Sequence, residues 1–213
     1  MLKLYYAPNT CALASHIALI EAGADYEAIR IDFTRQQQQS PDYLAINPKG
    51  RVPALVTDQG IITETPAILA YIAQSFPQAK LAPSDPFTFA RVQEFNSYLC
   101  STCHVAHAHL RRGPRWVEAH ETAAIEAMQR RVPSSVTECF ALIERGILKG
   151  PWAMGADYTV TDAYLFTVAN WLETDQADLS RLPRVLEHRQ RMSERASVKR
   201  ALAEQTQTLA PVA

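Results

Sequence analysis

Strand signals are confined to the first third of this 213-residue chain. Short runs rich in β-branched and aromatic residues predict strands at 2–6, 26–33, 52–57 and 61–63. An Asp-Gln-Gly turn at 58–60 separates the last two runs, which is typical of a hairpin. We therefore expect one small sheet early in the chain and none afterwards.

Helical patterns alternate with these runs. Residues 11–23 place apolar side chains at helical spacing and stop at Gly23, and residues 64–76 carry Pro66 in their first turn, where proline is tolerated. The resulting order is β-α-β, a connection at 34–51, and then β-β-α. This order predicts a small mixed sheet flanked by helices.

Only helical signals follow the segment LAPSDP at 81–86, which has the composition of a linker. The sequence thus predicts an α/β domain at residues 1–80, a linker at 81–86 and an all-α helical-bundle domain at 87–213. We expect helices in the second domain at 87–110, 116–147, 161–172 and 184–203.

Two local signals refine these helices. Pro133 lies inside the stretch 116–147, where we expect a kink or break. Thr159 and Asp162 precede an apolar run with the spacing of a capping box, with Asp in the position usually held by Glu or Gln. The helix at 161–172 therefore has a defined start.

Charge and cysteine content exclude several classes of protein. The 21 Lys and Arg nearly balance 22 Asp and Glu, so the excess of basic charge typical of nucleic-acid binders is missing. No apolar run approaches the roughly 20 residues that cross a bilayer, so we expect no membrane span. The first residues lack a signal-peptide layout, and we expect a cytoplasmic protein whose four cysteines are reduced.

Cys11 stands between a predicted strand and a predicted helix. Unpaired N–H groups at a helix start favour an anion, so a thiol there should have a lowered pKa and act as a nucleophile. The alternative is a buried structural cysteine, and position alone favours neither. Position 14 is Ala, so Cys11 lacks the partner of a C-x-x-C dithiol.

Two further segments suggest a peptide-like ligand. A cis bond between Val52 and Pro53 would turn the backbone of Val52 outward to pair with an extended peptide, whereas an ordinary trans proline would not. Glu64 and Thr65 open a helix, where Glu64 could bind an amine and the helix start a carboxylate. Plain capping is the alternative. Together with Cys11, these segments suit a small extended peptide.

At these residues the chain resembles the cytosolic glutathione transferase superfamily, most closely the bacterial beta class. The resemblance rests on YYAPNTCALASHIALIEAG, DYLAINPKGRVPALV, ITETPAILAYIA and GADYTVTDAYLFTVANWL, which with the linker cover nearly the whole chain. It implies a thioredoxin-like N-terminal domain that binds glutathione as co-substrate, a helical domain that forms the electrophile site, and a homodimer. No metal is expected.

The resemblance also implies roles for single residues. Cys11 matches the cysteine that lies against the sulfur of glutathione, and His104 matches a histidine near that thiol, so both are expected in catalysis. Val52, before Pro53, matches the residue that pairs with the cysteinyl backbone. The acidic-hydroxyl pair that holds the γ-glutamyl end is matched by Glu64 and Thr65.

Two positions and one loop depart from the class pattern. Val105 follows His104 where a basic residue is usual, and Arg51 precedes Val52 where Gln is frequent. The loop at 34–40 aligns poorly, so its basic glutathione contact is not assigned. Arg35 and Gln36 are the candidates in that loop, and Arg51 joins them as a candidate glutathione ligand.

Residues 100–104 read CSTCH, which is formally the attachment signature of c-type haem. At α-helical spacing Cys100, Cys103, His104 and His107 share one face, which could also hold zinc. Haem attachment requires export, for which there is no signal. We therefore expect the cysteines to pack and some of the histidines to line a substrate cleft.

The sequence predicts an enzyme that conjugates the glutathione thiolate to small hydrophobic electrophiles. One alternative is a glutathione-dependent thiol–disulfide reductase that acts through a mixed disulfide at Cys11. A second is a non-catalytic stress protein that binds glutathione or hydrophobic molecules. The electrophile itself leaves no motif in the sequence.

Overall fold

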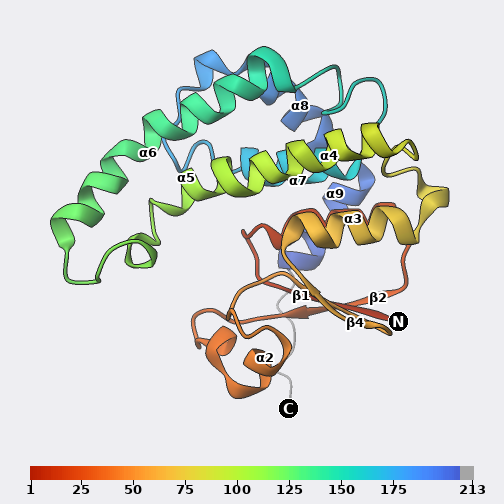
Figure 1. The fold of residues 1–213 in the computed structure, drawn as a ribbon, viewed down its shortest axis with the longest axis horizontal. Coiled ribbons are helices and arrows are strands. Elements are labelled where there is room, and N and C mark those ends of the chain that lie inside the picture. The colour runs from red at the N-terminus through yellow and green to blue at the C-terminus, as the bar shows by residue number, and fades with distance from the viewer. Residues whose placement is uncertain (207–213) are drawn as a thin grey trace.

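The computed structural model describes residues 1–206, and its N-terminal part is a four-stranded sheet (Figure 1). The strand order is β2-β1-β3-β4, with β1 parallel to β2 and antiparallel to β3, and β3 antiparallel to β4. The strands span Leu2–Tyr6, Tyr26–Arg30, Ala54–Thr57 and Gly60–Thr63. The predicted mixed sheet and its hairpin are confirmed, and two strands are shorter than expected.

Helices cover both sides of this sheet. α1 (Ala12–Glu21) and α3 (Thr65–Ser75) lie between the sheet and the helical part of the molecule, and α2 (Pro41–Ile46) lies on the opposite side (Figure 1). The connection at 34–51 was expected without a helix, but Ser40 starts α2 there by accepting a hydrogen bond from the Tyr43 N–H at 3.2 Å.

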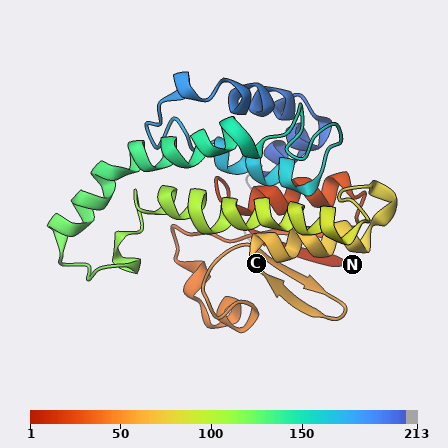
Figure 2. The same cartoon turned by 45° about the horizontal axis from the view of Figure 1, so that its top comes forward.

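The rest of the described chain is helical, apart from its connections (Figure 2). The helices are α4 (Pro86–Tyr98), α5 (His104–Ala108), α6 (Thr122–Leu142), α7 (Val160–Ala169), α8 (Pro183–Ser193) and α9 (Ala196–Thr206). A π-helical turn, Leu99–Cys103, joins α4 to α5. The fold class is confirmed: a thioredoxin-like sheet domain followed by a predominantly helical region. The last residues of the expected helical domain, 207–213, lie outside the described residues.

Three details of the helical part differ from the expectation. α6 begins at Thr122 rather than at 116, and the stretch 184–203 is divided into α8 and α9. Pro133 does not break α6. Hydroxyl groups in the following turn donate to backbone carbonyls of the same helix: Ser135 to Arg131 at 3.1 Å, and Thr137 to Pro133 at 2.6 Å.

α7 is buried along its whole length, and its capping box is confirmed. The Asp162 carboxylate accepts the Thr159 N–H at 2.7 Å and the Ala153 N–H at 2.6 Å, and it lies 2.8 Å from Nε2 of His188. This carboxylate therefore joins the start of α7, the loop before it and α8 inside the core.

The segment predicted as a linker is packed against the helical region. Leu81 is buried, and its carbonyl accepts the Val160 N–H at 2.8 Å. None of the helices in residues 1–206 is long and apolar enough to span a bilayer.

A polar cluster ties the two ends of the described chain together. His16 of α1 is fully buried, and its Nε2 lies 2.7 Å from the carboxylate of Glu204 in α9. The Tyr26 hydroxyl donates to the same carboxylate at 3.0 Å. α9 is thereby fixed against α1 and β2.

Candidate functional site

Cys11 immediately precedes α1, in the loop that follows β1. Its sulfur donates a hydrogen bond to the Val52 carbonyl at 3.6 Å. Burial has the largest effect on the pKa of its thiol, and Thr65, Glu64 and Cys100 contribute smaller effects. The structure therefore brings Cys11 together with Val52, Glu64 and Thr65, as the sequence predicted.

The Val52–Pro53 bond is cis, one of the two forms that the sequence left open. The loop before it is held from inside the fold: the Tyr43 hydroxyl and Nδ2 of Asn47 donate to the Arg51 carbonyl at 2.7 and 2.6 Å. Gly50 has φ +59°, in the left-handed region that favours glycine, which explains glycine in NPKGRVPAL. The backbone just before Val52 is thus held by two hydrogen bonds to the Arg51 carbonyl.

The start of α3 carries backbone strain. Glu64 has φ 73° and ψ 123°, a backbone conformation that residues other than glycine rarely adopt. Such outliers are frequent at functional sites. Its exposed carboxylate forms an ion pair with Nζ of Lys49, which also donates to the Thr63 hydroxyl at 2.7 Å. Thr65, the next residue, is buried.

The expected acidity of Cys11 is wrong. Burial raises the pKa of its thiol to about 11, and the Thr65 side chain only partly opposes this effect. The Thr10 hydroxyl already accepts the Ala12 N–H at 3.3 Å at the start of α1. Cys11 is therefore a protonated thiol that donates a hydrogen bond.

His104 lies on the helical side of the site. Its backbone N–H donates to the carbonyl of Leu99, five residues back, which closes the π-helical turn. Its ring lies 5.0 Å from that of Trp171, and burial, with positive charge on His107, Arg115 and Arg51, lowers the pKa of His104 to about 4. At neutral pH it is an uncharged imidazole.

The CSTCH side chains contact different neighbours. Cys103 is buried beside Cys139, and Cys100 interacts with Tyr164. His107 pairs with Asp175, with Nδ1 2.7 Å from Oδ1. Within residues 1–206 no group of three or more His, Cys, Asp and Glu side chains is placed to hold a metal ion.

Arg35 and Gln36 lie apart from these contacts. Arg35 is highly exposed, and its Nε lies 3.6 Å from the Asp32 carboxylate. Gln36 is exposed and has φ 54°. The contacts that join Cys11, Val52, Glu64 and Thr65 do not involve this loop, and its role in ligand binding stays a prediction.

The sequence gave no reason to select three residues that the structure adds. Lys49 neutralises Glu64, Trp171 packs on both His104 and His107, and Arg115 contributes to the lowered pKa of His104. Lys49 lies within the recognised NPKGRVPAL segment and Trp171 within the α7 motif, so each could have been considered. Arg115 lies in a connection without any motif.

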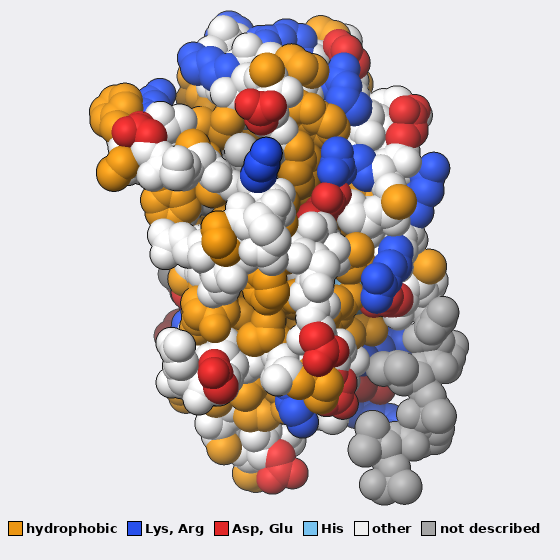
Figure 3. Space-filling model, turned by 90° about the vertical axis from the view of Figure 1, so that its right-hand side faces the viewer, with side chains coloured by type: hydrophobic (Ala, Val, Ile, Leu, Met, Phe, Trp, Pro, Cys, Tyr) orange, Lys and Arg blue, Asp and Glu red, His pale blue; other side chains and the backbone are white. Residues whose placement is uncertain are grey.

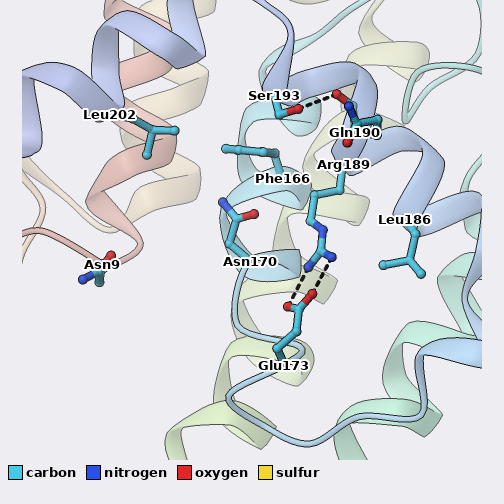
Figure 4. A pocket seen from close by; sticks show the side chains of 9 residues that line it. All are labelled: Asn9, Phe166, Asn170, Glu173, Leu186, Arg189, Gln190, Ser193 and Leu202. Atoms are coloured by element: carbon cyan, nitrogen blue, oxygen red, sulfur yellow. Dashed lines mark hydrogen bonds and ion pairs between the residues drawn. The ribbon is translucent and has the colours of Figure 1, made fainter.

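A cavity of about 660 Å³ lies elsewhere, among α7, α8, α9 and the loop before α1 (Figure 4). The close-up shows Arg189 and Glu173 paired with each other, with Nη2 2.5 Å from Oε1, and Asn9 and Leu202 standing apart from them. Its charges are satisfied internally, and it contains none of the predicted site residues.

Comparisons with known proteins identify relatives along nearly the whole chain. The glutathione S-transferase N-terminal domain family matches residues 1–74. Glutathione S-transferase GstA of Escherichia coli O157:H7 is 33% identical over 205 residues, covering 95% of this chain and 98% of its own.

Two solved structures extend the similarity to three dimensions. A glutathione transferase homologue from Sulfitobacter with bound glutathione has a TM-score of 0.92 at 43% identity, covering 97% of this chain and 99% of its own. The bacterial beta class glutathione S-transferase of Sphingomonas chungbukensis has a TM-score of 0.82 at 32% identity, covering 96% and 98%.

Proposed function

Because the chain belongs to the glutathione S-transferase family, we propose that it joins the thiol of glutathione to small hydrophobic electrophiles. The family and the beta-class resemblance read from the sequence are confirmed. With an aryl halide, the glutathione sulfur forms a bond to the ring carbon, the carbon–halogen bond breaks, and the halide leaves with the bonding electrons. The thiol proton passes to solvent.

The observation that carries this proposal is the convergence of Cys11, Val52, Glu64 and Thr65. Glutathione offers an amine, a cysteinyl peptide unit and a thiol along an extended chain. We propose that Glu64 and Thr65 hold the γ-glutamyl end, that the Val52 backbone pairs with the cysteinyl unit, and that the thiol comes to lie beside Cys11. Of the basic candidates, Arg51 is exposed, and its positive charge contributes to the lowered pKa of His104.

The protonated state of Cys11 favours transfer over disulfide reduction. At pH 7 a thiol with a pKa of about 11 is ionised in roughly one molecule in ten thousand, and only the thiolate attacks a disulfide. A neutral thiol can instead donate a hydrogen bond to a bound glutathione thiolate, stabilising the charge that attacks the electrophile. Transfer is also the activity that the relatives support, and neither alternative is favoured by them.

We propose that residues 1–80 bind glutathione and that residues 87–213, joined through 81–86, supply the electrophile site. The described part of the second segment would contribute a cluster of aromatic rings to it, in which His104, His107 and Trp171 pack together. Apolar and aromatic surface near the reacting sulfur suits a hydrophobic electrophile.

Parallel assays test this function. The purified protein with glutathione should conjugate an aryl halide with saturation kinetics, and it should reduce a mixed disulfide of glutathione far more slowly. Calorimetry measures glutathione binding independently of turnover. Binding without conjugation would support the non-catalytic alternative, and dominant disulfide reduction would support the reductase.

We further propose that the protein is a homodimer working in the cytoplasm, where its four unpaired cysteines would stay reduced. Hydrophobic side chains gather on the side of the molecule that carries the start of α4 (Figure 3). Phe87 of α4 is 75% exposed and lines an apolar cavity of about 390 Å³. Association would cover such a surface. Light scattering at micromolar concentration should give twice the 23.8 kDa of one chain, and Phe87→Ser should shift the protein towards monomer.

A further inference from the structure

His107 of α5 and Asp175, in the turn after α7, form a hydrogen-bonded pair. Nδ1 of His107 lies 2.7 Å from Oδ1 and 2.9 Å from Oδ2 of Asp175. The Asp175 side chain is only 2% exposed, whereas that of His107 is 22% exposed. Among residues 1–206, His107 is the only hydrogen-bond partner of this carboxylate. A buried carboxylate is costly without a donor, so the pair should be persistent.

Trp171 fixes both members of the pair. The Asp175 N–H donates to the Trp171 carbonyl at 2.9 Å, which ties the turn to the residues just after α7. The indole ring stacks on the His107 ring, with centroids 4.3 Å apart and an angle of 21° between the planes. The same indole packs on His104 at 5.0 Å. The pair is therefore part of the cluster of aromatic rings that we propose for the electrophile site.

The contacts of His107 leave one ring nitrogen free for chemistry. Carboxylate oxygens only accept hydrogen bonds, so Nδ1 is the donor to Asp175. Nε2 has no hydrogen-bond partner among the described residues, and it is not one of their buried unpartnered atoms, so it is accessible from outside this part of the chain. His188 differs, because it faces Asp162 through Nε2 and its Nδ1 is buried without a partner. Of these two histidines, only His107 can exchange a proton with a ligand.

A histidine arranged in this way suits proton transfer at Nε2. The carboxylate on Nδ1 holds the orientation of the ring and compensates the positive charge of an imidazolium. His104, one turn earlier, is a poor proton donor at neutral pH, because burial lowers its pKa to about 4. A chloride leaves without a proton, but an oxygen atom that gains charge during addition requires one. This is the case when an epoxide ring opens.

We propose that His107 is a catalytic general acid, positioned by Asp175, and that the second substrates of the protein include epoxides. This inference rests on the proposed transferase function. The glutathione thiolate forms a bond to an epoxide carbon, the bond from that carbon to oxygen breaks, and the oxygen keeps the electron pair. The oxygen then takes the proton from Nε2, which leaves a neutral ring still bound to Asp175. Solvent returns a proton to Nε2 before the next turnover.

The test compares styrene oxide with 1-chloro-2,4-dinitrobenzene in the complete protein with saturating glutathione. One positioned general acid is worth about 10²–10⁴-fold in rate, so His107→Gln should lower kcat for the epoxide at least about a hundredfold. For the chloride, kcat should change little. Imidazole in solution should restore part of the epoxide activity of His107→Gly. His120→Gln, which removes an exposed histidine before α6, should leave both reactions unchanged.

Asp175→Asn tests the positioning role. The amide keeps the size of the side chain but loses its charge, and its NH2 group can donate, so the hydrogen of Nδ1 is no longer fixed. We expect a lower kcat for styrene oxide with KM unchanged, and a normal kcat for the chloride. Asp175→Glu, which restores a carboxylate, should recover part of the loss. A merely structural pair would slow both reactions alike.

Three outcomes would overturn the inference. Equal losses for both substrates in His107→Gln would make the pair structural, and an unchanged epoxide rate would remove His107 from catalysis. A wild-type protein that conjugated the chloride but not the epoxide would exclude the substrate class and leave the transferase function intact. Failure of that function is a separate result: the wild type would turn over neither substrate, which would overturn both proposals.

Discussion

The sulfur of Cys11 donates a hydrogen bond to the Val52 carbonyl across 3.6 Å, joining the start of α1 to the loop before β3. Such a donor must keep its proton, and burial of the thiol ensures that it does. The same carbonyl belongs to the backbone that we expect to pair with glutathione. Binding of the ligand should therefore free the Cys11 thiol to turn toward the incoming sulfur.

The order of cysteine alkylation follows from these environments. With a pKa raised to about 11, Cys11 should react slowly with iodoacetamide at pH 7 and faster as the pH approaches 11. A hydrogen bond from Cys103 lowers the pKa of Cys139, which is half-buried and should react first. Peptide mapping after brief labelling measures both rates. Cys103→Ala should slow the alkylation of Cys139. Early labelling of Cys11 would contradict its protonated state.

Cys11→Ala separates the two chemistries. Conjugation should be retained in part, because the start of α1 and His104 remain beside the bound glutathione sulfur. Any disulfide reduction should be abolished, since Ala14 leaves no second thiol in a C-x-x-C arrangement. Steady-state kinetics of both reactions on the same preparation provide the check. If both activities fell together to background, Cys11 would be the nucleophile of a common step.

Glu64→Ala should weaken glutathione binding. One charge-assisted hydrogen bond is worth about 1.5–3 kcal/mol, so the dissociation constant should rise at least about tenfold. Calorimetry measures the constant directly. Glu94→Ala, which removes an exposed carboxylate from α4, serves as control and should bind normally. Unchanged affinity in a folded Glu64→Ala protein would exclude Glu64 from the site.

Asp162→Ala should destabilise the fold far more than the loss of a surface cap. Removing this buried carboxylate leaves two backbone N–H groups and His188 without their partner, which costs about 3–5 kcal/mol. Asp85→Ala removes an exposed cap that accepts the Thr88 N–H at 2.8 Å, and its effect should be much smaller. Urea unfolding compares the two, and similar losses would mean that the α7 cap is not central to stability.

The acid side of the stability profile should depend on His104. Its pKa is lowered to about 4 in the folded protein from 6.5 in an unfolded chain, so unfolding takes up a proton between these values. The free energy of unfolding should therefore fall as the pH drops from about 6.5 towards 4. His104→Gln should make this fall shallower without abolishing it, because burial also lowers the pKa of His16. Denaturant titrations at several pH values give the free energy of unfolding of both proteins. If this free energy fell equally steeply with pH in the wild type and in His104→Gln, a buried neutral His104 would be refuted.

The sequence predicted the elements that rest on strong local patterns. β1, the hairpin of β3 and β4, and the cap of α7 at Thr159 all carry periodic or capping signals that act over a few residues. α2 escaped prediction because its six residues are shorter than two turns and its sequence falls between two polar loops. α6 continues through Pro133 and buries Val132, Val136 and Phe140, and such tertiary packing can outweigh the one backbone hydrogen bond that a proline removes.

The sequence selected Cys11, Val52, Glu64 and Thr65, which lie together in the structure, but it did not predict the protonation state of Cys11. Helix position alone suggested an acidic Cys11, and only the packed structure reveals the burial that reverses this effect. Contacts between distant segments leave no local pattern.

The link between His16 and Glu204 has a consequence for synthesis of the chain on the ribosome. The two residues are 188 positions apart, so His16 is made long before its partner. At 5–20 residues per second, this interval is about 10–40 s. During that time the sheet can form while the face of α1 that carries His16 remains open to solvent or to chaperones. Only the emergence of α9 completes the core, so the final closure of the first helix should wait until Glu204 has left the ribosome.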